Sequence, residues 1–252
     1  MRTNLIKINN EQTVVDGKLD MVIAFDTTGS MRSYLDDVKR HITTLIPQLL
    51  SDNVDMRIGI VAFGDYCDMK SANEFGNAYQ VLYPTNNKST IMEFISRAKD
   101  THGGDADEFY ELVIKKIVEE TPWREEATKT VLFIADCDPH GVGYSYHPIV
   151  KNAQIDWREE AKKASEKGIQ FDTISIHGTS HKWYEELAHI TDGIYTPFKS
   201  SNKTADYIKT VAYARGGSNT RDLFLATMDS FKEDAEMSAV YSTYAKEIVF
   251  KD

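Results

Sequence analysis

The sequence predicts an α/β fold, doubly wound, with a mainly parallel central sheet, helices on both faces and a helical extension at the C-terminal end. Three observations predict it. Short apolar runs recur along the chain, amphipathic helical patterns separate them, and the runs at 21–25 and 131–135 show no polar alternation. A strand without polar alternation is buried on both faces, so helices must cover both sides of the sheet, joined by right-handed crossovers.

Four apolar runs are the expected strands, at residues 21–25, 56–63, 131–135 and 171–176. The sheet that they form is expected to be mainly parallel. The run at 56–63 is open to an antiparallel arrangement beside its neighbours. Residues 5–15 precede an Asp16–Gly17 turn and predict an edge strand or a hairpin.

Helical spacing separates these strands. Apolar residues at steps of three and four predict one long helix with a buried face, and its repeating residues are Met31, Leu35, Val38, Ile42, Leu45 and Leu49. A second helix has the same spacing in Phe109, Leu112, Val113 and Ile117. Ser89 is expected to cap a helix carrying Ile91, Ile95 and Ala98, and a helix at 157–167 is expected to stop at Gly168.

Three segments are expected: an edge strand or hairpin at 1–18, the α/β domain at 19–215 and a helical extension at 216–252. In the extension one stripe carries Phe224, Met228, Phe231 and Ala235. We expect this stripe to pack on its own domain, the alternative being a docking surface for a partner.

Composition limits the classes of protein and of partner that the chain is expected to have. With 252 residues and 41% apolar residues the chain can bury one sizeable core, and no apolar segment approaches the roughly 20 residues that span a bilayer. The two cysteines, Cys67 and Cys137, suit neither a disulfide framework nor a zinc spacing. A net charge of -10 disfavours nucleic acid and anionic membrane as partners. The expectation is a soluble, cytoplasmic protein.

The candidate site begins where the first strand ends. Asp26, Thr28 and Ser30 alternate on a loop that turns into a helix, and Gly29 lets the chain make the turn. Ligands of open α/β sheets bind at the carboxyl ends of strands, and oxygen donors of this kind suit Mg²⁺, with Mn²⁺ or Ca²⁺ as alternatives. The competing interpretation is that the aspartate and Ser30 only cap a helix.

Two further acidic segments are expected near this loop. Asp136 ends the strand at 131–135, which the topology places beside the first strand. The loop at 103–108 carries Asp105 and Asp107 before a helix, and either can join the cation. The alternative is that acidic groups simply favour a helix N-terminus.

These motifs resemble a known family. Residues 26–30, Asp-Thr-Thr-Gly-Ser, are similar to the metal-ion-dependent adhesion site (MIDAS) of von Willebrand factor A (vWA) domains, which are Rossmann-like. Residues 57–68, 103–108 and 134–141 look like the A domains that accompany alpha-kinases. The resemblance extends over about residues 19–213.

The resemblance implies a magnesium ion held by Asp26, Thr28, Ser30, Asp136 and a second-loop residue, for which Asp105 is favoured over Asp107. It implies interaction with a protein partner whose Glu or Asp carboxylate completes the coordination. Many such sites have a threonine in the second loop, so the acidic loop here is a departure that makes the site more negative. A kinase domain is absent from this chain, so no phosphotransfer is implied.

Two alternatives remain beside this non-enzymatic interpretation. One is a Mg-dependent phosphohydrolase, since paired aspartates and Mg²⁺ also serve phosphoryl transfer. The other is a structural scaffold with a vestigial metal site. No catalytic residue is assigned, and a partner-contacting rim is expected from Asp65, Asp107, Asp138 and His140. His140 and His147 are interpreted as ordinary loop histidines rather than zinc ligands.

Overall fold

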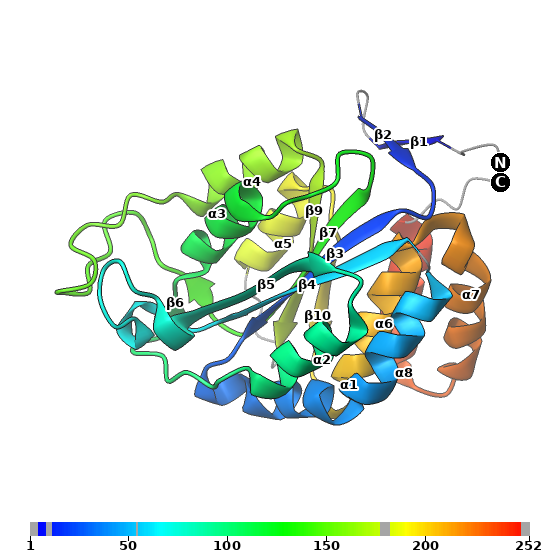
Figure 1. Cartoon of the computed structure of the whole chain (residues 1–252), viewed down its shortest axis with the longest axis horizontal. Coiled ribbons are helices and arrows are strands. Elements are labelled where there is room, and N and C mark those ends of the chain that lie inside the picture. The colour runs from blue at the N-terminus through cyan, green and yellow to red at the C-terminus, as the bar shows by residue number, and fades with distance from the viewer. Residues whose placement is uncertain (1–4, 9–11, 54, 177–181, 248–252) are drawn as a thin grey trace.

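The central element is a six-stranded sheet with the order β10-β9-β7-β3-β4-β5 (Figure 1). The computed structural model describes residues 5–8, 12–53, 55–176 and 182–247. Five strands are parallel and only the edge strand β5 is antiparallel, so the predicted fold class is confirmed. The strands are β3 (Leu19–Asp26), β4 (Met56–Phe63), β5 (Tyr79–Thr85), β7 (Thr128–Ala135), β9 (Ile169–Ile176) and β10 (Tyr195–Phe198).

The strand β4 runs parallel to β3, so the antiparallel alternative for residues 56–63 is wrong on that side. The reason lies in the connection, because the 21-residue helix α1 (Arg32–Asp52) carries the chain back along the sheet before β4 begins. Only β5 pairs with β4 in the antiparallel sense. The two strands at the edges of the sheet, β5 and β10, were not predicted from the sequence.

Helices cover both faces of this sheet (Figure 1). Odd-numbered side chains of β3, such as Ile23, pack with α1, α2 and α6, whereas Val22 and Ala24 pack with α3, α4 and α5. The first face holds α1, α2 (Lys88–Arg97) and α6 (Thr204–Arg215), and the second holds α3 (Tyr110–Glu120), α4 (Trp157–Glu166) and α5 (Lys182–Ile190). The N-cap of α2 is Asn87, whose side chain accepts from Thr90 N at 3.1 Å, and not Ser89 as expected.

The C-terminal extension packs on its own domain, as predicted. It consists of α7 (Arg221–Ser230) and α8 (Ala235–Glu247). Phe224 is completely buried in the core, and Met228 and Phe231 pack against it. Because α7 ends at Ser230, Ala235 begins a new helix and does not continue the stripe. Among the described residues, no helix is long and apolar enough to cross a membrane.

Several short elements complete the described part of the chain. The strands β1 (Leu5–Ile8) and β2 (Gln12–Val15) pair with each other in the antiparallel sense, and residues 9–11 lie outside the described residues. The strands β6 (Asp107–Glu108) and β8 (Asp138–Pro139) form a parallel pair beside the candidate site. Short 3-10 helices are η1 (Gly29–Met31), η2 (Tyr66–Asp68), η3 (Gly76–Ala78), η4 (Ser201–Lys203) and η5 (Gly217–Thr220).

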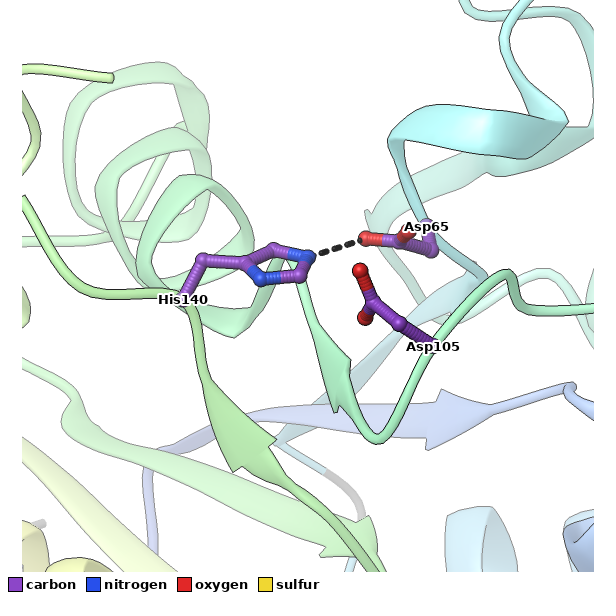
Figure 2. A group of neighbouring side chains, drawn as sticks. All are labelled: Asp65, Asp105 and His140. Carbon is purple, nitrogen blue, oxygen red and sulfur yellow. Dashed lines mark hydrogen bonds and ion pairs between the residues drawn. The ribbon is translucent and has the colours of Figure 1, made fainter. Parts of the chain in front are cut away.

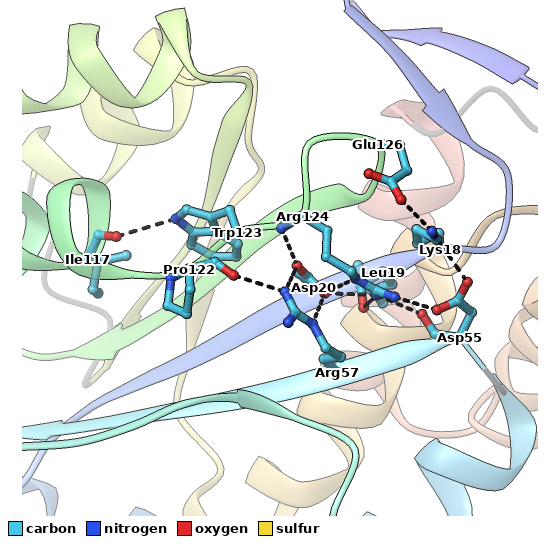
Figure 3. Close-up of polar contacts among 10 residues, drawn as sticks. All are labelled: Lys18, Leu19, Asp20, Asp55, Arg57, Ile117, Pro122, Trp123, Arg124 and Glu126. Carbon is cyan, nitrogen blue, oxygen red and sulfur yellow. Dashed lines mark hydrogen bonds and ion pairs between the residues drawn. The ribbon is translucent and has the colours of Figure 1, made fainter.

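A buried carboxylate holds the amino-terminal end of β3, far along the strand from the candidate site (Figure 3). Asp20 is completely buried and accepts hydrogen bonds from Arg57 Nε at 2.8 Å and from Arg124 Nε and N, each at 2.9 Å. Burial alone would raise the pKa of Asp20, but the hydrogen bonds from Arg57 and Arg124 outweigh it and lower the pKa. The charged carboxylate therefore stabilises the fold.

Gly193 is required for close packing at the junction of α5 and β10. A Cβ atom at this position would lie 1.9 Å from the carbonyl oxygen of Phe171, a backbone atom that cannot move aside. We expect Gly193→Ala to reduce the free energy of unfolding by about 2 kcal/mol because an overpacked site must distort. Urea unfolding measures the change. Gly141→Ala is the control, since a Cβ there meets nothing within 4 Å, and equal losses would contradict the prediction.

Candidate functional site

The candidate site is built around Asp26, the last residue of the central strand β3. Its carboxylate is completely buried. Oδ1 accepts hydrogen bonds from Thr28 N at 2.7 Å and from Thr28 Oγ1 at 2.6 Å, and Oδ2 accepts one from the Tyr110 hydroxyl. Thr28 Oγ1 lies 3.5 Å from Ser30 Oγ. The loop therefore brings Asp26, Thr28 and Ser30 together, as their spacing predicts.

Helix capping does not account for these hydroxyls. The N-cap of η1 is Thr28 and the N-cap of α1 is Met31, and neither makes a side-chain capping hydrogen bond. Ser30 is exposed within η1. The Thr28 hydroxyl thus donates to the strand-end carboxylate with Ser30 Oγ beside it, and neither hydroxyl caps a helix.

The loop that precedes β6 is held against the β3 loop. Thr27 Oγ1 donates to Phe63 O at 2.8 Å and lies 3.0 Å from Thr101 Oγ1, and Thr101 N donates to Thr27 O at 3.0 Å. Asp68 clamps the same loop, because its carboxylate accepts from His102 N at 2.9 Å and from Gly103 N at 3.2 Å. Consequently the acidic segment at 103–108 lies beside the end of β3.

Asp136 follows β7, the strand next to β3, and is partly exposed. The pKa of Asp26 is raised to about 7, chiefly by burial and in smaller part by the charge of Asp136, against the opposing hydrogen bonds from Thr28 and Tyr110. The thiol of Cys137 lies 3.3 Å from Asp136 Oδ1. Two carboxylates from neighbouring strands thus act on one another at this edge of the sheet, as expected from the topology.

Glu108 is a further acidic residue of the candidate site that was not predicted from the sequence. It lies on β6, is 3% exposed, and its Oε2 has no hydrogen-bond partner. The pKa of Glu108 is raised to about 10. Burial is the largest cause, and the negative charges of Asp26 and Asp65 act in the same direction. The available signal was its position directly before the apolar pair Phe109 and Tyr110, which indicates a buried carboxylate.

Gly103 allows Glu108 to approach the β3 loop. A Cβ on Gly103 would lie 2.6 Å from Glu108 Oε1 and 3.4 Å from Thr28 Cγ2, and its φ of +69° is one that glycine favours. The glycine therefore occupies the narrow space between the acid and the threonine. A side chain at this position would separate them.

Asp105 lies in a second group, with Asp65 and His140 (Figure 2). It is exposed, and its Oδ2 accepts from the Tyr144 hydroxyl at 2.9 Å. One ligand atom from each member of the group lies within 4.8 Å of the others. The structure therefore joins the favoured second-loop aspartate to residues that we expected on the rim.

The rim itself differs from the expectation. Asp65 and His140 are 0% and 2% exposed, so they cannot form a surface that a partner touches. Asp107 and Asp138 are exposed and face one another in the β6-β8 pair. His140 is covered by the ring of Tyr144, which stacks on the imidazole with the two ring centroids 3.6 Å apart.

The donors around Asp26 suit a hard divalent cation. Hydroxyl and carboxylate oxygens are what Mg²⁺, Mn²⁺ and Ca²⁺ prefer, and no softer donor is needed from Thr28, Ser30 or Glu108. The buried Oε2 of Glu108 without a partner is the atom that a nearby cation would satisfy. The residues present therefore fit a cation of this class.

The family follows from sequence comparison. The profile described as "von Willebrand factor type A domain" matches residues 20–212, from the second residue of β3 into α6. The chain belongs to the von Willebrand factor type A family. No curated protein matches the sequence of this vWA protein.

Solved structures share the vWA fold at low sequence identity. The pilus adhesin SpaC from Lactobacillus rhamnosus GG matches with a TM-score of 0.58 and 14% identity over 85% of this chain and 34% of that chain. The "von Willebrand factor type A from Catenulispora acidiphila" matches with a TM-score of 0.54 and 16% identity over 82% of this chain and 44% of that one. Our chain spans less than half the length of these proteins, and at this identity the likeness shows the fold alone.

Tyr110 is expected to position the strand-end carboxylate of the vWA domain. Its buried hydroxyl donates to Asp26 Oδ2 and accepts from Cys137 N at 3.3 Å. We expect Tyr110→Phe to weaken binding of Mn²⁺ about tenfold, because partners behind a ligand hold its orientation. Calorimetric titration measures this. Tyr83→Phe, on the exposed edge strand, is the control, and unchanged affinity in Tyr110→Phe would refute the positioning role.

Proposed function

We propose that this vWA protein is a divalent-cation-dependent protein-interaction module. Asp26, Thr28 and Ser30 would hold the cation, with Asp136 beside them and Glu108 as the second-loop residue in place of Asp105. Mg²⁺ is the expected ion, and Mn²⁺ or Ca²⁺ can replace it in an all-oxygen site. A MIDAS of this kind would be the functional centre of the chain.

The observation that carries the proposal is the concentration of acidic groups at one strand end. Asp26 and Glu108 are both buried, and one oxygen of Glu108 is without a partner. Burying carboxylates together is costly unless a positive charge compensates them. A bound divalent cation supplies that charge and would convert a destabilising cluster into a stabilising one.

The partner is expected to be a protein that offers a Glu or Asp carboxylate to the cation. Neutral hydroxyl ligands leave the ion electrophilic, so it can accept another oxygen from outside. The exposed Ser30 marks the open side of the site. SpaC, one of the similar structures, is described as a pilus adhesin, which agrees with a role in interaction. The cellular compartment of this chain does not follow from that of SpaC.

We further propose that the chain is not an enzyme. We also propose that it is related to the A domains that accompany alpha-kinases. In this proposal Glu108 and Asp136 contribute to the metal site, and neither acts as a nucleophile. The cytoplasm remains the expected compartment, where the thiols of Cys67 and Cys137, unpaired in the structure, would stay reduced.

The first test is direct titration of the purified protein with Mg²⁺ and Mn²⁺. We expect one saturable site and a rise in melting temperature that follows cation concentration, because a ligand that binds only the folded state stabilises it. Chelator should reverse both effects. If the wild type binds neither ion, the metal-dependent proposal is refuted and the scaffold alternative is favoured.

The second test separates interaction from catalysis. A pull-down with Mg²⁺, repeated with chelator and with Ser30→Ala, should retain a partner only in the first condition. Glu93→Gln is the matched control because Glu93 is exposed on α2, where it pairs with Arg97. Release of phosphate from simple phosphoesters, dependent on Mg²⁺ and abolished in Ser30→Ala, would favour the phosphohydrolase instead.

A further inference from the structure

We propose that Asp65, Asp105 and His140 form a second metal site, separate from the Asp26 site and selective for Zn²⁺ over Mg²⁺. The three residues come from three different loops, after β4, before β6 and after β8 (Figure 2). Their ligand atoms all lie within 4.8 Å of one another. This proposal does not depend on cation binding at Asp26.

The distances within the group suit a shared ion. His140 Nε2 lies 2.8 Å from Asp65 Oδ1. Two atoms that are each about 2.1 Å from a zinc ion, at the tetrahedral angle around it, lie about 3.4 Å apart. A zinc ion can therefore take both atoms as ligands after the proton between them leaves, once the two side chains have moved apart by about 0.6 Å.

Asp65 carries an unpartnered oxygen at this site. Its side chain is 0% exposed, and Oδ2 makes no hydrogen bond while Oδ1 contacts His140. A Cβ on Gly104 would lie 3.9 Å from Oδ2, so this oxygen faces the loop that carries Asp105. A buried carboxylate oxygen without a partner is costly, and a metal bound between the loops would satisfy it.

The surroundings hold the ligands in place. Tyr144 donates to Asp105 Oδ2 at 2.9 Å, and its ring stacks on His140 at a centroid distance of 3.6 Å. His140 N also donates to Glu108 O at 3.2 Å. Partners of this kind fix the orientation of ligating side chains, which is a usual feature of metal sites.

The donor set determines the class of ion. The Asp26 site offers oxygen alone, whereas this group adds an imidazole nitrogen to two carboxylates. Imidazole suits Zn²⁺ far better than Mg²⁺, and Zn²⁺ accepts mixed nitrogen and oxygen ligands at similar distances. The competing account is a histidine–aspartate hydrogen bond that needs no metal, with Asp105 held only by Tyr144.

The test is calorimetric titration of the full chain with Zn²⁺ in excess Mg²⁺, which occupies the oxygen site. We expect one equivalent of Zn²⁺ to bind, and Asp105→Asn to weaken it at least about tenfold. Asp105 is exposed, so this substitution leaves the core intact. Asp107→Asn is the matched control, because Asp107 is also exposed, lies two residues further on in β6, and is outside the group.

Each outcome decides the matter. Zinc binding that is lost in Asp105→Asn and in His140→Gln, but kept in Asp107→Asn and Asp26→Asn, supports the second site. Equal zinc affinity in wild type and Asp105→Asn, or no zinc uptake by the wild type in excess Mg²⁺, overturns it. Retention in Asp26→Asn also separates this proposal from the first, since either site can then fail alone.

Discussion

Asp26→Asn is expected to reduce Mg²⁺ and Mn²⁺ affinity by about 100-fold or more. The Asp26 carboxylate is the proposed ligand that accepts hydrogen bonds from both the Thr28 hydroxyl and the Tyr110 hydroxyl, and losing a ligand costs at least as much as losing the partner behind it. Asn has nearly the same shape, and its amide oxygen can keep the two hydrogen bonds from Thr28, so the loop should keep its conformation although the hydrogen bond from Tyr110 is lost. Calorimetric titration at neutral pH gives the affinity directly.

The same substitution is expected to leave the cation-free protein as stable as the wild type, or more stable. The wild-type carboxylate is completely buried near Asp136, and burial raises its pKa to about 7. An amide removes this charge. Thermal unfolding with and without Mg²⁺ measures both effects, and Glu93→Gln is the control. A variant that keeps the cation-dependent rise in melting temperature would place the ion elsewhere.

The second large effect is expected at the opposite end of β3. We expect Asp20→Asn to reduce the free energy of unfolding by about 3 kcal/mol at pH 7, because it leaves Arg57 and Arg124 facing an uncharged, buried partner. Urea unfolding measures the loss. Asp55→Asn is the control, since Asp55 contacts Arg124 from a side chain that is 47% exposed, where pairs contribute at most about 1 kcal/mol.

The pH dependence of this effect has a definite sign. The pKa of Asp20 is lowered in the folded state, so its contribution is present above the ordinary value of 3.8 and is lost as pH falls through the folded-state pKa. The difference between wild type and Asp20→Asn should therefore shrink in strongly acidic solution. A difference that stays constant at low pH would mean that shape, not charge, determines the loss.

Much of the fold was predictable because its signals are local. The uninterrupted apolar run ending at Asp26 predicts a doubly buried strand, and the spacing from Met31 to Leu49 predicts the helix after it. The edge strands were missed for the opposite reason. Strand β5 is only partly buried and contains Pro84. Its sequence therefore resembles that of a loop, and it can be recognised as a strand only from its pairing with β4.

The strand-end loop was determined by the sequence itself. Asp26, Thr28 and Ser30 lie within five consecutive residues, so their spacing on one turn already brings the hydroxyls to the carboxylate. Only the tertiary structure decided which acid joins them. Glu108 is brought beside Thr28, and Asp105 beside Asp65 and His140, by the β6-β8 pairing and the contacts of Gly103. The physical reason is that the places of Asp105 and Glu108 depend on pairing and contacts between distant loops, which residue types alone do not encode.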